Sequence, residues 1–433
     1  MKVLRIMLAG SVAALTVLTT AGPAAAGRTG TSRVSVSNTG GQAGTASDLP
    51  AISADGRYVA FTSAAKLANG DTNAASDVYL RDRRAGTTVL VSVSSTGAAG
   101  DDGSLVPSIS ADGRYVSFYS VASTLVPGDT NGGFDVFVRD LRGRTTTRVS
   151  VSSSGTQAND WSFDHAISAN GRYVTYYSYA SNLVPGDSNG VSDVFVHDRR
   201  TGTTTRVSVS DAGAQGNAES RYPSISANGR YVGFGSPASN LVPDDTNGAF
   251  DVFVHDLRTG TTTRVSVSDA GVQGNAESFE TAVSATGRYV AFTSSASTLV
   301  PGDTNFTYDV FLRDRHTATT VLVSVSSTGV QGEVYSSDPA ISATGRYVTF
   351  TSVASTLVPG DTNGFSDVFV RDLRGQTTTR VSVSSTGTQA GNASFDPAIS
   401  ADGRYVAFTS DASDLVPGDT NGFSDVFVRR TRR

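Results

Sequence analysis

The 433-residue sequence contains no cysteine, two methionines and a single tryptophan. Without cysteine, a disulfide framework, a thiolate zinc site and a thiol nucleophile are all excluded. Positive charge is also scarce, because 34 Lys and Arg stand against 39 Asp and Glu, a formal net charge of −5. Sequence-independent nucleic-acid binding requires clustered positive charge. We therefore expect no nucleic-acid partner. The hydrophobic fraction of 38% is enough for a packed core.

The first 26 residues have the pattern of a secretory signal peptide. A basic start at residues 1–5 precedes an apolar run over residues 6–21, and Ala24, Ala25 and Ala26 supply the small residues that signal peptidase accepts. A retained membrane anchor is disfavoured because glycine, serine and threonine interrupt the run. No later apolar stretch is long enough to span a bilayer. We expect a secreted, extracellular or periplasmic protein whose mature part is one domain, residues 27–433.

One phrase occurs seven times along the chain. It reads Ile-Ser-Ala-Asp-Gly-Arg-Tyr-Val in its first copy and changes little in the others, which begin at Ile52, Ile109, Ile167, Ile225, Val283, Ile341 and Ile399. The copies follow one another at 57 and then 58 residues, and such a regular period indicates a repeat architecture. Nearly the whole mature chain is covered by the repeats.

Each repeat predicts four strands, which we name A to D in chain order. In the first repeat, strand A begins at Ala51 and turns through Asp55 and Gly56 into strand B over residues 57–63. A longer loop leads to strand C over residues 77–81, and a short turn leads to strand D over residues 88–94. No part of the repeat has the i, i+3, i+4 spacing of an amphipathic helix.

The two ends of the mature chain predict how the repeats close. Residues 32–37 match strand D without the rest of a repeat, and residues 425–429 are a strand C with no strand D after it. Pairing the two removes exposed strand edges. The predicted fold is therefore all-β, a single seven-bladed β-propeller of four-stranded antiparallel blades, closed by the N-terminal strand completing the last blade. An open stack of repeats is the competing architecture.

The repeat resembles the TolB-like propeller repeat, which is related to the WD type. The resemblance rests on Ser-Ala-Asp-Gly-Arg-Tyr-Val-Ala-Phe-Thr-Ser at residues 53–63 and on Asp-Val-Phe-Val-Arg-Asp in strand C, and it covers residues 32–430. It implies a secreted bacterial propeller. TolB itself carries an additional N-terminal domain and fewer blades, so the resemblance does not extend to its partners.

The loop between strands B and C contains a recurring Asp-Thr-Asn followed by a further Asp. Oxygen-bearing side chains at positions 1, 3 and 7 resemble the start of a calcium loop, but calcium takes six to eight oxygens and the later carboxylates are missing. We expect an Asx turn and no required cofactor, with calcium as the alternative. Its candidate ligands in the last two repeats are Asp361, Asn363, Asp367, Asp419, Asn421 and Asp425.

The informative column of the repeat lies two residues before the small residue that begins strand A. It is occupied in turn by Leu49, Val106, Asp164, Tyr222, Glu280, Asp338 and Asp396. Strand A lines the central channel of a propeller, so we expect this column to ring the channel mouth. Carboxylates beside aromatic rings suit a sugar or a cationic ligand. The candidate ligand-binding residues are Trp161, Asp164, Tyr222, Glu280, Asp338 and Asp396, and the alternative is a solvated face without a ligand.

Other recurring charged residues favour structural roles. The Arg of each Gly-Arg-Tyr-Val is expected to make contacts within or between blades. His197 and His255 stand where other repeats have Arg, and no His cluster or Ser/His/Asp set is visible. We therefore expect a monomeric, non-catalytic binding or scaffolding propeller that recognises a protein or glycan through the face carrying the long B–C and D–A loops. The alternative is a carbohydrate-active enzyme that uses the acids at the channel mouth.

Overall fold

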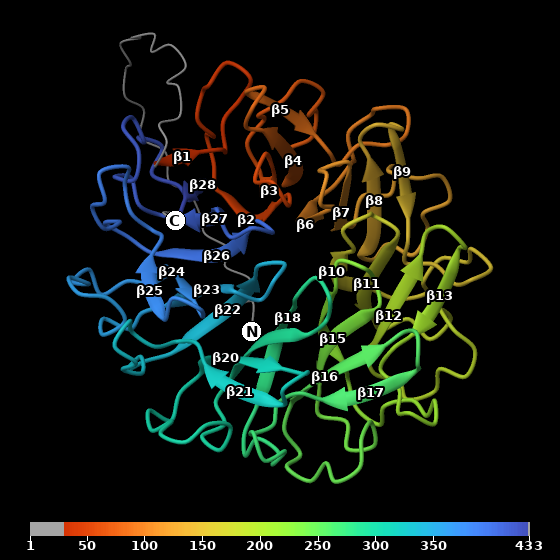
Figure 1. Ribbon diagram of the computed structural model, residues 1–433. Helices are drawn as coiled ribbons and strands as arrows, with labels where there is room; N and C mark the ends of the chain where they lie inside the picture. The colour runs from red at the N-terminus through yellow and green to blue at the C-terminus, as the bar shows by residue number, and fades with distance from the viewer. Residues whose placement is uncertain (1–29, 432–433) are drawn as a thin grey trace.

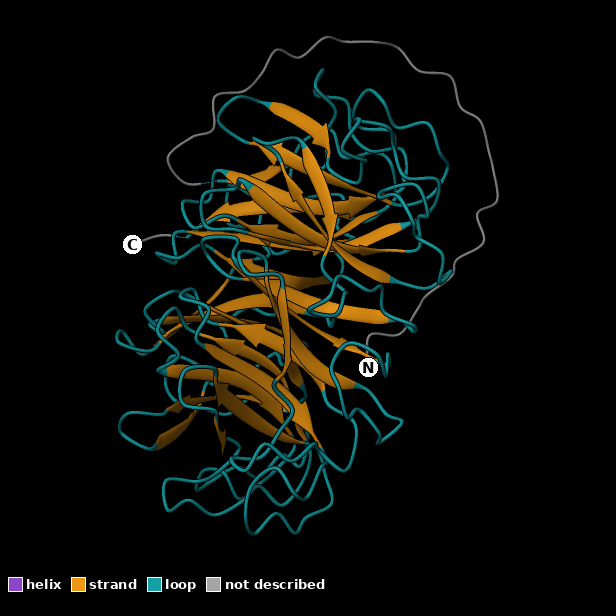
Figure 2. Ribbon diagram, turned by 90° about the vertical axis from the view of Figure 1, so that its right-hand side faces the viewer, coloured by secondary structure: helices purple, strands orange, loops and turns teal. Residues whose placement is uncertain are grey.

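The computed structural model describes residues 30–431, which form seven four-stranded antiparallel sheets arranged around a central axis (Figure 1). The predicted signal segment, residues 1–26, lies outside the described residues. Residues 30–431 contain strands and loops and no helix (Figure 2). The predicted all-β, seven-bladed propeller is confirmed.

In blades 1 to 6 the strands follow one another in chain order from the axis outwards, and in blade 7 the N-terminal strand β1 is added outside β26, β27 and β28. Blade 1 consists of β2 (Ser47–Ile52), β3 (Tyr58–Ser63), β4 (Asp77–Asp82) and β5 (Thr87–Leu90). Blade 2 consists of β6 (Ser104–Ile109), β7 (Tyr115–Ser120), β8 (Asp135–Asp140) and β9 (Thr145–Arg148). Blade 3 consists of β10 (Ser162–Ile167), β11 (Tyr173–Ser178), β12 (Asp193–Asp198) and β13 (Thr203–Arg206). Blade 4 consists of β14 (Arg221–Ile225), β15 (Tyr231–Ser236), β16 (Asp251–Asp256) and β17 (Thr261–Arg264). Blade 5 consists of β18 (Ser278–Val283), β19 (Tyr289–Ser294), β20 (Asp309–Asp314) and β21 (Thr319–Leu322). Blade 6 consists of β22 (Ser336–Ile341), β23 (Tyr347–Ser352), β24 (Asp367–Asp372) and β25 (Thr377–Arg380). Blade 7 consists of β26 (Ser394–Ile399), β27 (Tyr405–Ser410), β28 (Asp425–Arg430) and β1 (Thr31–Arg33).

The N-terminal strand β1 closes the ring as the sequence predicts. It pairs antiparallel with β28, with Thr31 opposite Arg429 and Arg33 opposite Phe427. The backbone N–H of Val34 donates to the carbonyl of Val426 at 2.8 Å, one residue beyond the strand. The strand is shorter than the predicted residues 32–37, because the chain bends away into a turn after Val34.

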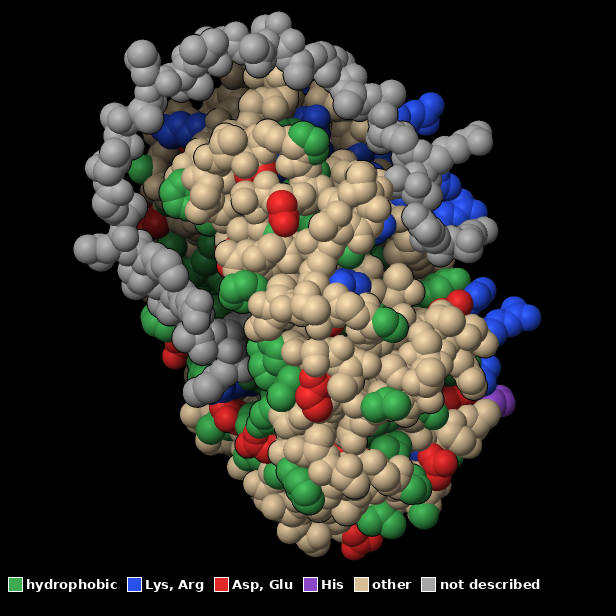
Figure 3. Space-filling model, turned by 90° about the vertical axis from the view of Figure 1, so that its left-hand side faces the viewer, with side chains coloured by type: hydrophobic (Ala, Val, Ile, Leu, Met, Phe, Trp, Pro, Cys, Tyr) green, Lys and Arg blue, Asp and Glu red, His purple; other side chains and the backbone are tan. Residues whose placement is uncertain are grey.

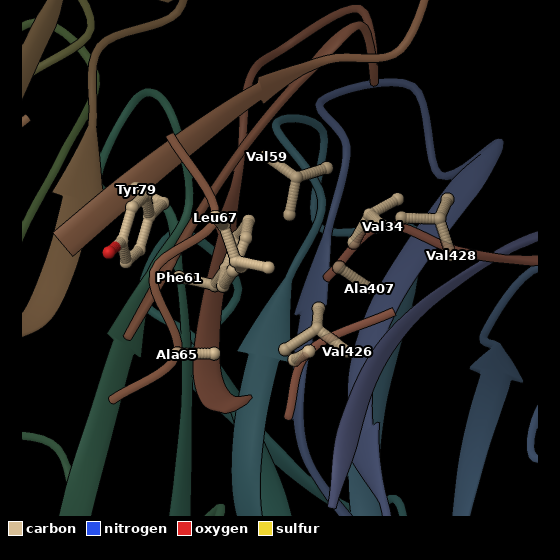
Figure 4. Close-up of a cluster of buried hydrophobic side chains, with 10 residues drawn as sticks. Val34, Val59, Phe61, Ala65, Leu67, Tyr79, Ala407, Val426 and Val428 are labelled. Atoms are coloured by element: carbon tan, nitrogen blue, oxygen red, sulfur yellow. The ribbon is translucent and has the colours of Figure 1, made fainter. Parts of the chain in front are cut away.

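The hydrophobic core lies between the blades, because each described cluster combines side chains from two neighbours. The cluster in Figure 4 joins blade 1 to blade 7: Phe61 from β3 packs with Ala407, Val426 and Val428 from β27 and β28. Val34 belongs to the same cluster and is 2% exposed. The predicted apolar character of both faces of strand B follows from this arrangement, since each sheet is covered on both sides.

The recurring Arg makes the structural contact that the sequence predicts. In blade 1, Arg57 donates from Nε and Nη2 to the two carboxylate oxygens of Asp82 at 2.9 and 2.6 Å, and its guanidinium covers the ring of Tyr58. The same bidentate pair occurs in blades 2 to 6 as Arg114–Asp140, Arg172–Asp198, Arg230–Asp256, Arg288–Asp314 and Arg346–Asp372. In blade 7 Arg404 instead contacts Asp402 at 3.0 Å.

The A–B turns join successive blades through a glycine that has no room for a side chain. A Cβ on Gly113 of blade 2 would lie 2.3 Å from the ring of Tyr58 of blade 1, and one on Gly56 of blade 1 would lie 2.2 Å from Tyr405 of blade 7. The backbone of Gly56 also has a φ of +72°, which glycine adopts without steric cost. Glycine in this turn therefore serves both the hairpin and the blade-to-blade contact.

A partly buried carboxylate in β2 makes stability depend on pH. Burial raises the pKa of Asp48 from 3.8 to about 6. The folded state therefore holds the proton more tightly than the unfolded state, so the stabilisation is complete below pH 4 and is lost as pH rises through 6. A rise of this size corresponds to about 3 kcal/mol.

We expect Asp48→Asn to raise the melting temperature at pH 7 and to leave it unchanged at pH 4. The measurement is thermal unfolding of both proteins across this range. Asp198, which pairs with Arg172, does not titrate in this window, because the guanidinium lowers its pKa to about 2. Asp77 and Asp309 have pKa values raised to about 6, but both are present in the two proteins, so they do not contribute to the difference between the curves. Parallel pH curves for the two proteins would contradict the assignment.

Candidate functional site

The column of variable residues lies inside the innermost strands, and not before them as the sequence predicts. Strand β2 begins at Ser47, four residues earlier than the predicted Ala51. Asp48 pairs with Thr62 and Ala51 pairs with Ala60, so Leu49 and Pro50 together oppose a single residue of β3. This is a β-bulge, and a comparable irregularity interrupts the first strand of all seven blades. The strand was predicted too short because its register breaks at the bulge.

The bulge holds each residue of the column in the left-handed region of backbone conformation. The φ angles are +54° at Leu49, +50° at Val106, +25° at Asp164, +56° at Tyr222, +53° at Glu280, +53° at Asp338 and +51° at Asp396. This conformation disfavours side chains other than those of Asn and Asp, and it is a genuine outlier for a β-branched residue such as Val106. The sequence contains 45 glycines, yet no blade places one here. Every blade therefore carries a side chain at this position despite the strain.

The seven bulges surround one pocket in the central channel. Two adjacent residues from each blade line it, and its volume is about 270 Å³. Five of the six predicted ligand-binding residues lie together there: Asp164, Tyr222, Glu280, Asp338 and Asp396. Blades 1 and 2 contribute the apolar Leu49 and Val106. The lining contains four carboxylates and no lysine or arginine, so the pocket has a negative and an apolar side.

Glu280 and Asp338 lie next to each other in the pocket. Oε2 of Glu280 accepts hydrogen bonds from Oγ1 of Thr293 at 2.9 Å and from the backbone N–H of Asp338 at 3.0 Å. Burial raises the pKa of Glu280, and the neighbouring charge of Asp338 adds to the rise. A positively charged group in the pocket would relieve this repulsion.

The aromatic candidates divide between the pocket and the surface. Tyr222 lines the pocket, and its ring packs on Phe279 and Phe250 with centroids 5.9 and 6.5 Å apart. Trp161 is 50% exposed, contacts Phe134 and Phe163, and is not among the pocket residues. The structure therefore does not bring Trp161 together with the carboxylates.

The second lining residue of each blade was not singled out from the sequence. It is a proline in five blades, whereas blade 3 has His165 and blade 5 has Thr281. His165 is 8% exposed, and its ring meets that of Tyr119 edge-on at 6.2 Å. The signal was present in the alignment of the repeats, because His165 breaks a column that is otherwise mostly proline.

The B–C loops hold paired aspartates that an arginine from the outermost strand bridges. In blade 2, Nη1 of Arg148 lies 3.2 Å from Asp129 and 3.3 Å from Asp135, and Gln157 donates to both carboxylates. The same arginine bridge occurs in blades 3, 4, 6 and 7, with Arg206, Arg264, Arg380 and Arg33.

The residues of the calcium alternative belong to this network in blades 6 and 7. Arg380 lies 3.1 Å from both Asp361 and Asp367, and Arg33 lies 3.0 and 3.1 Å from Asp419 and Asp425. The amides of Asn363 and Asn421 donate to Asp367 and Asp425, and their Oδ1 atoms accept from the backbone N–H two residues later. The latter contact is an Asx turn made by the asparagine. An internal guanidinium thus lies where the alternative places a metal.

The two histidines of strand C occupy a structural position. Nδ1 of His197 lies 2.8 Å from Oγ1 of Thr204, and His255 makes the same contact with Thr262. In blade 2, Arg139 contacts the equivalent Thr146. Burial lowers the pKa of His197 to about 4, so this side chain is neutral at pH 7.

Across residues 30–431, no group of three or more His, Cys, Asp or Glu side chains is placed to hold a metal ion. The same part of the chain contains no helix that is long and apolar enough to cross a membrane.

The basic side chains gather at one side of the molecule. In Figure 3, Lys and Arg lie mostly along one edge, and Asp and Glu are scattered over the remaining surface. The short C–D turns carry exposed arginines, among them Arg84, Arg142, Arg200, Arg258 and Arg374. The acidic pocket and the basic turns are therefore separate features of the surface.

Comparison with known proteins supports the fold. No family model matches the sequence, and no curated protein matches it. An oligogalacturonate lyase in complex with manganese superimposes with a TM-score of 0.56 at 12% identity, covering 93% of each chain. The β-propeller domain of the trilobed protease from Pyrococcus furiosus has a TM-score of 0.53 at 10% identity, covering 90% of this chain and 96% of the other.

TolB from Acinetobacter baumannii is also similar, with a TM-score of 0.42 at 14% identity over 83% of this chain and 76% of TolB. Similarity at these sequence identities shows a shared fold. It does not show a shared function, which depends on the residues of each protein's own site. The chain is a seven-bladed β-propeller, and its fold resembles that of the β-propeller domain of the trilobed protease.

Proposed function

We propose that the protein is an exported, non-catalytic binding propeller that holds a group of its ligand in the acidic pocket of the central channel. The observation that carries the proposal is the convergence of Asp164, Glu280, Asp338 and Asp396 on one pocket without a lysine or arginine in its lining. The repeats supply the scaffold, and the variable bulge residues supply the chemistry.

The pocket favours a cationic group of a protein ligand. Its volume of about 270 Å³ accommodates a single side chain or one sugar ring better than an extended oligosaccharide. The raised pKa of Glu280 beside Asp338 means that a lysine or arginine inserted there would gain charge pairing and remove repulsion. The apolar Leu49 and Val106 would contact the aliphatic stem of such a side chain. A glycan remains the second class of ligand.

One observation favours a carbohydrate-active enzyme as the second candidate. Carboxyl groups with raised pKa values next to a second carboxylate serve as general acids in glycoside cleavage, and Glu280 beside Asp338 has this character. Incubation with a panel of glycans separates the two functions. Product formation that Glu280→Gln abolishes would establish the enzyme and overturn the binding proposal.

We expect the double substitution Asp338→Asn and Asp396→Asn to weaken ligand binding at least about tenfold, because two charges leave the pocket while its shape is kept. The double variant should fold normally, and its free energy of unfolding should be unchanged or slightly higher. The measurement is affinity for ligands found on peptide and glycan arrays, with lysine- and arginine-containing peptides as the expected class.

The matched control is Asp361→Asn with Asp419→Asn in the B–C loops. Both carboxylates contact buried guanidinium groups, so this pair should lower stability and leave affinity nearly unchanged. If both double variants lose affinity equally, or if the control alone loses it, the pocket is not the binding site.

A further inference from the structure

The B–C loop of blade 1 lacks the side chains that neutralise its aspartates elsewhere. Asp71 and Asp77 correspond to Asp129 and Asp135 of blade 2. Leu90, the last residue of β5, stands where blade 2 has Arg148. Ala99 stands where blade 2 has Gln157, as the equivalent β-bridges to Val93 and Val151 show. Blade 1 therefore keeps both carboxylates and has lost both side chains that bridge them.

Two carboxylate oxygens are consequently left without a partner. Oδ1 of Asp71 and Oδ2 of Asp77 are buried and accept no hydrogen bond. Asp77 is fully buried, and its other oxygen accepts from Oγ of Ser92 at 2.6 Å. The second oxygen of Asp71 accepts from the hydroxyl of Tyr79.

The other blades indicate which atoms correspond to these two oxygens. In blade 2, Oδ1 of Asp129 and Oδ2 of Asp135 are the atoms that contact the guanidinium of Arg148. Oδ1 of Asp135 accepts from Ser150, as Oδ1 of Asp77 accepts from Ser92. The free oxygens of blade 1 are therefore the equivalents of the two atoms that hold the internal cation.

A third oxygen faces the same place. Nη2 of Arg148 donates to the carbonyl of Gly128 at 3.3 Å, and Arg380 makes the same contact with Gly360. Gly70 occupies this position in blade 1, directly before Asp71. By this equivalence, two carboxylates and one carbonyl of blade 1 border the position that the guanidinium occupies in blade 2.

We propose that blade 1 binds a hard divalent cation, Ca²⁺, between Asp71, Asp77 and the carbonyl of Gly70, at the position that an arginine guanidinium occupies in five other blades. The cation would take the place of the missing guanidinium and remove the repulsion between the two neighbouring carboxylates.

The B–C loop of blade 5 also lacks the arginine, but its two aspartates still have a partner. Blade 5 replaces the arginine by leucine, Leu322, but it retains Gln331. The amide of Gln331 donates to Asp303 at 2.7 Å and to Asp309 at 2.8 Å, so both carboxylates have a partner. The loss of both bridging side chains, and not of arginine alone, distinguishes the blade 1 site.

The chemistry of the donors selects the ion and its affinity. All three donors are oxygens, which Ca²⁺ and Mg²⁺ prefer, and Ca²⁺ tolerates irregular geometry with several waters. The guanidinium nitrogens lie 3.0 to 3.5 Å from the carboxylates, so each oxygen has to move inward by about 1 Å or less to reach a calcium distance. Three protein oxygens predict a weak site, with a dissociation constant of about 0.1 to 1 mM.

The test is titration of the chelator-treated protein with CaCl₂ and with MgCl₂ by isothermal calorimetry, together with thermal unfolding. We expect one calcium site, a higher melting temperature with calcium, and weaker binding of magnesium. Leu90→Arg supplies the missing guanidinium and should abolish calcium binding while raising the melting temperature without calcium. Leu322→Arg in blade 5 is the matched control and should leave calcium binding unchanged.

Asp71→Asn provides a second variant that does not insert a larger side chain. It should reduce calcium affinity at least about tenfold, because one of the two charges is lost. The proposal is overturned if the wild-type protein binds no calcium at about 10 mM. It is also overturned if calcium binding survives in both Leu90→Arg and Asp71→Asn, or if Leu322→Arg abolishes it equally.

Discussion

A chain that begins at Asn38 is expected to melt about 6 °C below a chain that begins at Gly30. The shorter chain lacks β1, whose backbone bonds to β28 would be replaced by an exposed strand edge. It also loses Val34 from the core between blades 7 and 1, and Arg33 from between Asp419 and Asp425. Burial of apolar surface and a buried ion pair together contribute several kcal/mol, so the expected loss is about 5 kcal/mol.

Thermal unfolding of the two chains measures this effect, and Arg33→Leu in the longer chain separates the ion pair from the strand. The substitution should reproduce a part of the loss, since Asp425 is fully buried and would lose its guanidinium. Equal melting temperatures for the two chain lengths would mean that blade 7 does not depend on β1.

Asp193→Asn is expected to lower stability, whereas Asp77→Asn is expected to leave it unchanged or to raise it. Asp193 is fully buried and accepts hydrogen bonds from Arg206, Gln215, Asn189 and Ser208. In Asp193→Asn, an NH₂ group replaces one of the carboxylate oxygens and points at side chains that are themselves donors. Breaking the buried ion pair in this way should lower the free energy of unfolding by about 3 kcal/mol.

Asp77 is equally buried but has no guanidinium beside it, and burial raises its pKa to about 6. Removing its charge should therefore leave stability at pH 7 unchanged or raise it, provided that calcium is absent. Urea unfolding in a chelating buffer measures both variants. If both lower the free energy of unfolding to the same extent, the arginine bridge contributes nothing that the loop itself does not supply.

The architecture could be predicted from the sequence because the repeat fixes it seven times over. Glycine and the residues before it mark each A–B turn, and the spare strand at residues 32–37 identifies the closure. What could not be predicted was the start of the innermost strand. Leu49 and Pro50 break the pattern of alternating side chains, and the bulge they form depends on pairing with β3, which is a tertiary contact.

Most residues of the candidate site could be predicted from the sequence, but their exact arrangement could not. Comparing the repeats singled out Asp164, Tyr222, Glu280, Asp338 and Asp396, because their column differs between blades and is mostly acidic in blades 3 to 7. Trp161 was grouped with them because it lies close in sequence, but a bulge three residues later separates it from the pocket. The bridge between Arg148 and its two aspartates joins a loop to a strand across 13 and 19 residues, which no local pattern reveals.

The closure by β1 also determines how the ring would respond to mechanical tension. Thr31 lies opposite Arg429, so the two ends of the closure leave the molecule at the same end of the β1–β28 pair. Force applied between residues 30 and 430 would load the first hydrogen-bonded pair alone and then the next, as in opening a zipper. If β1 and β28 were instead pulled from opposite ends of the pair, all of the hydrogen bonds between them would bear the force together. The closure therefore contributes to thermal stability through its core contacts. It is expected to open at low force when the chain is pulled at both ends.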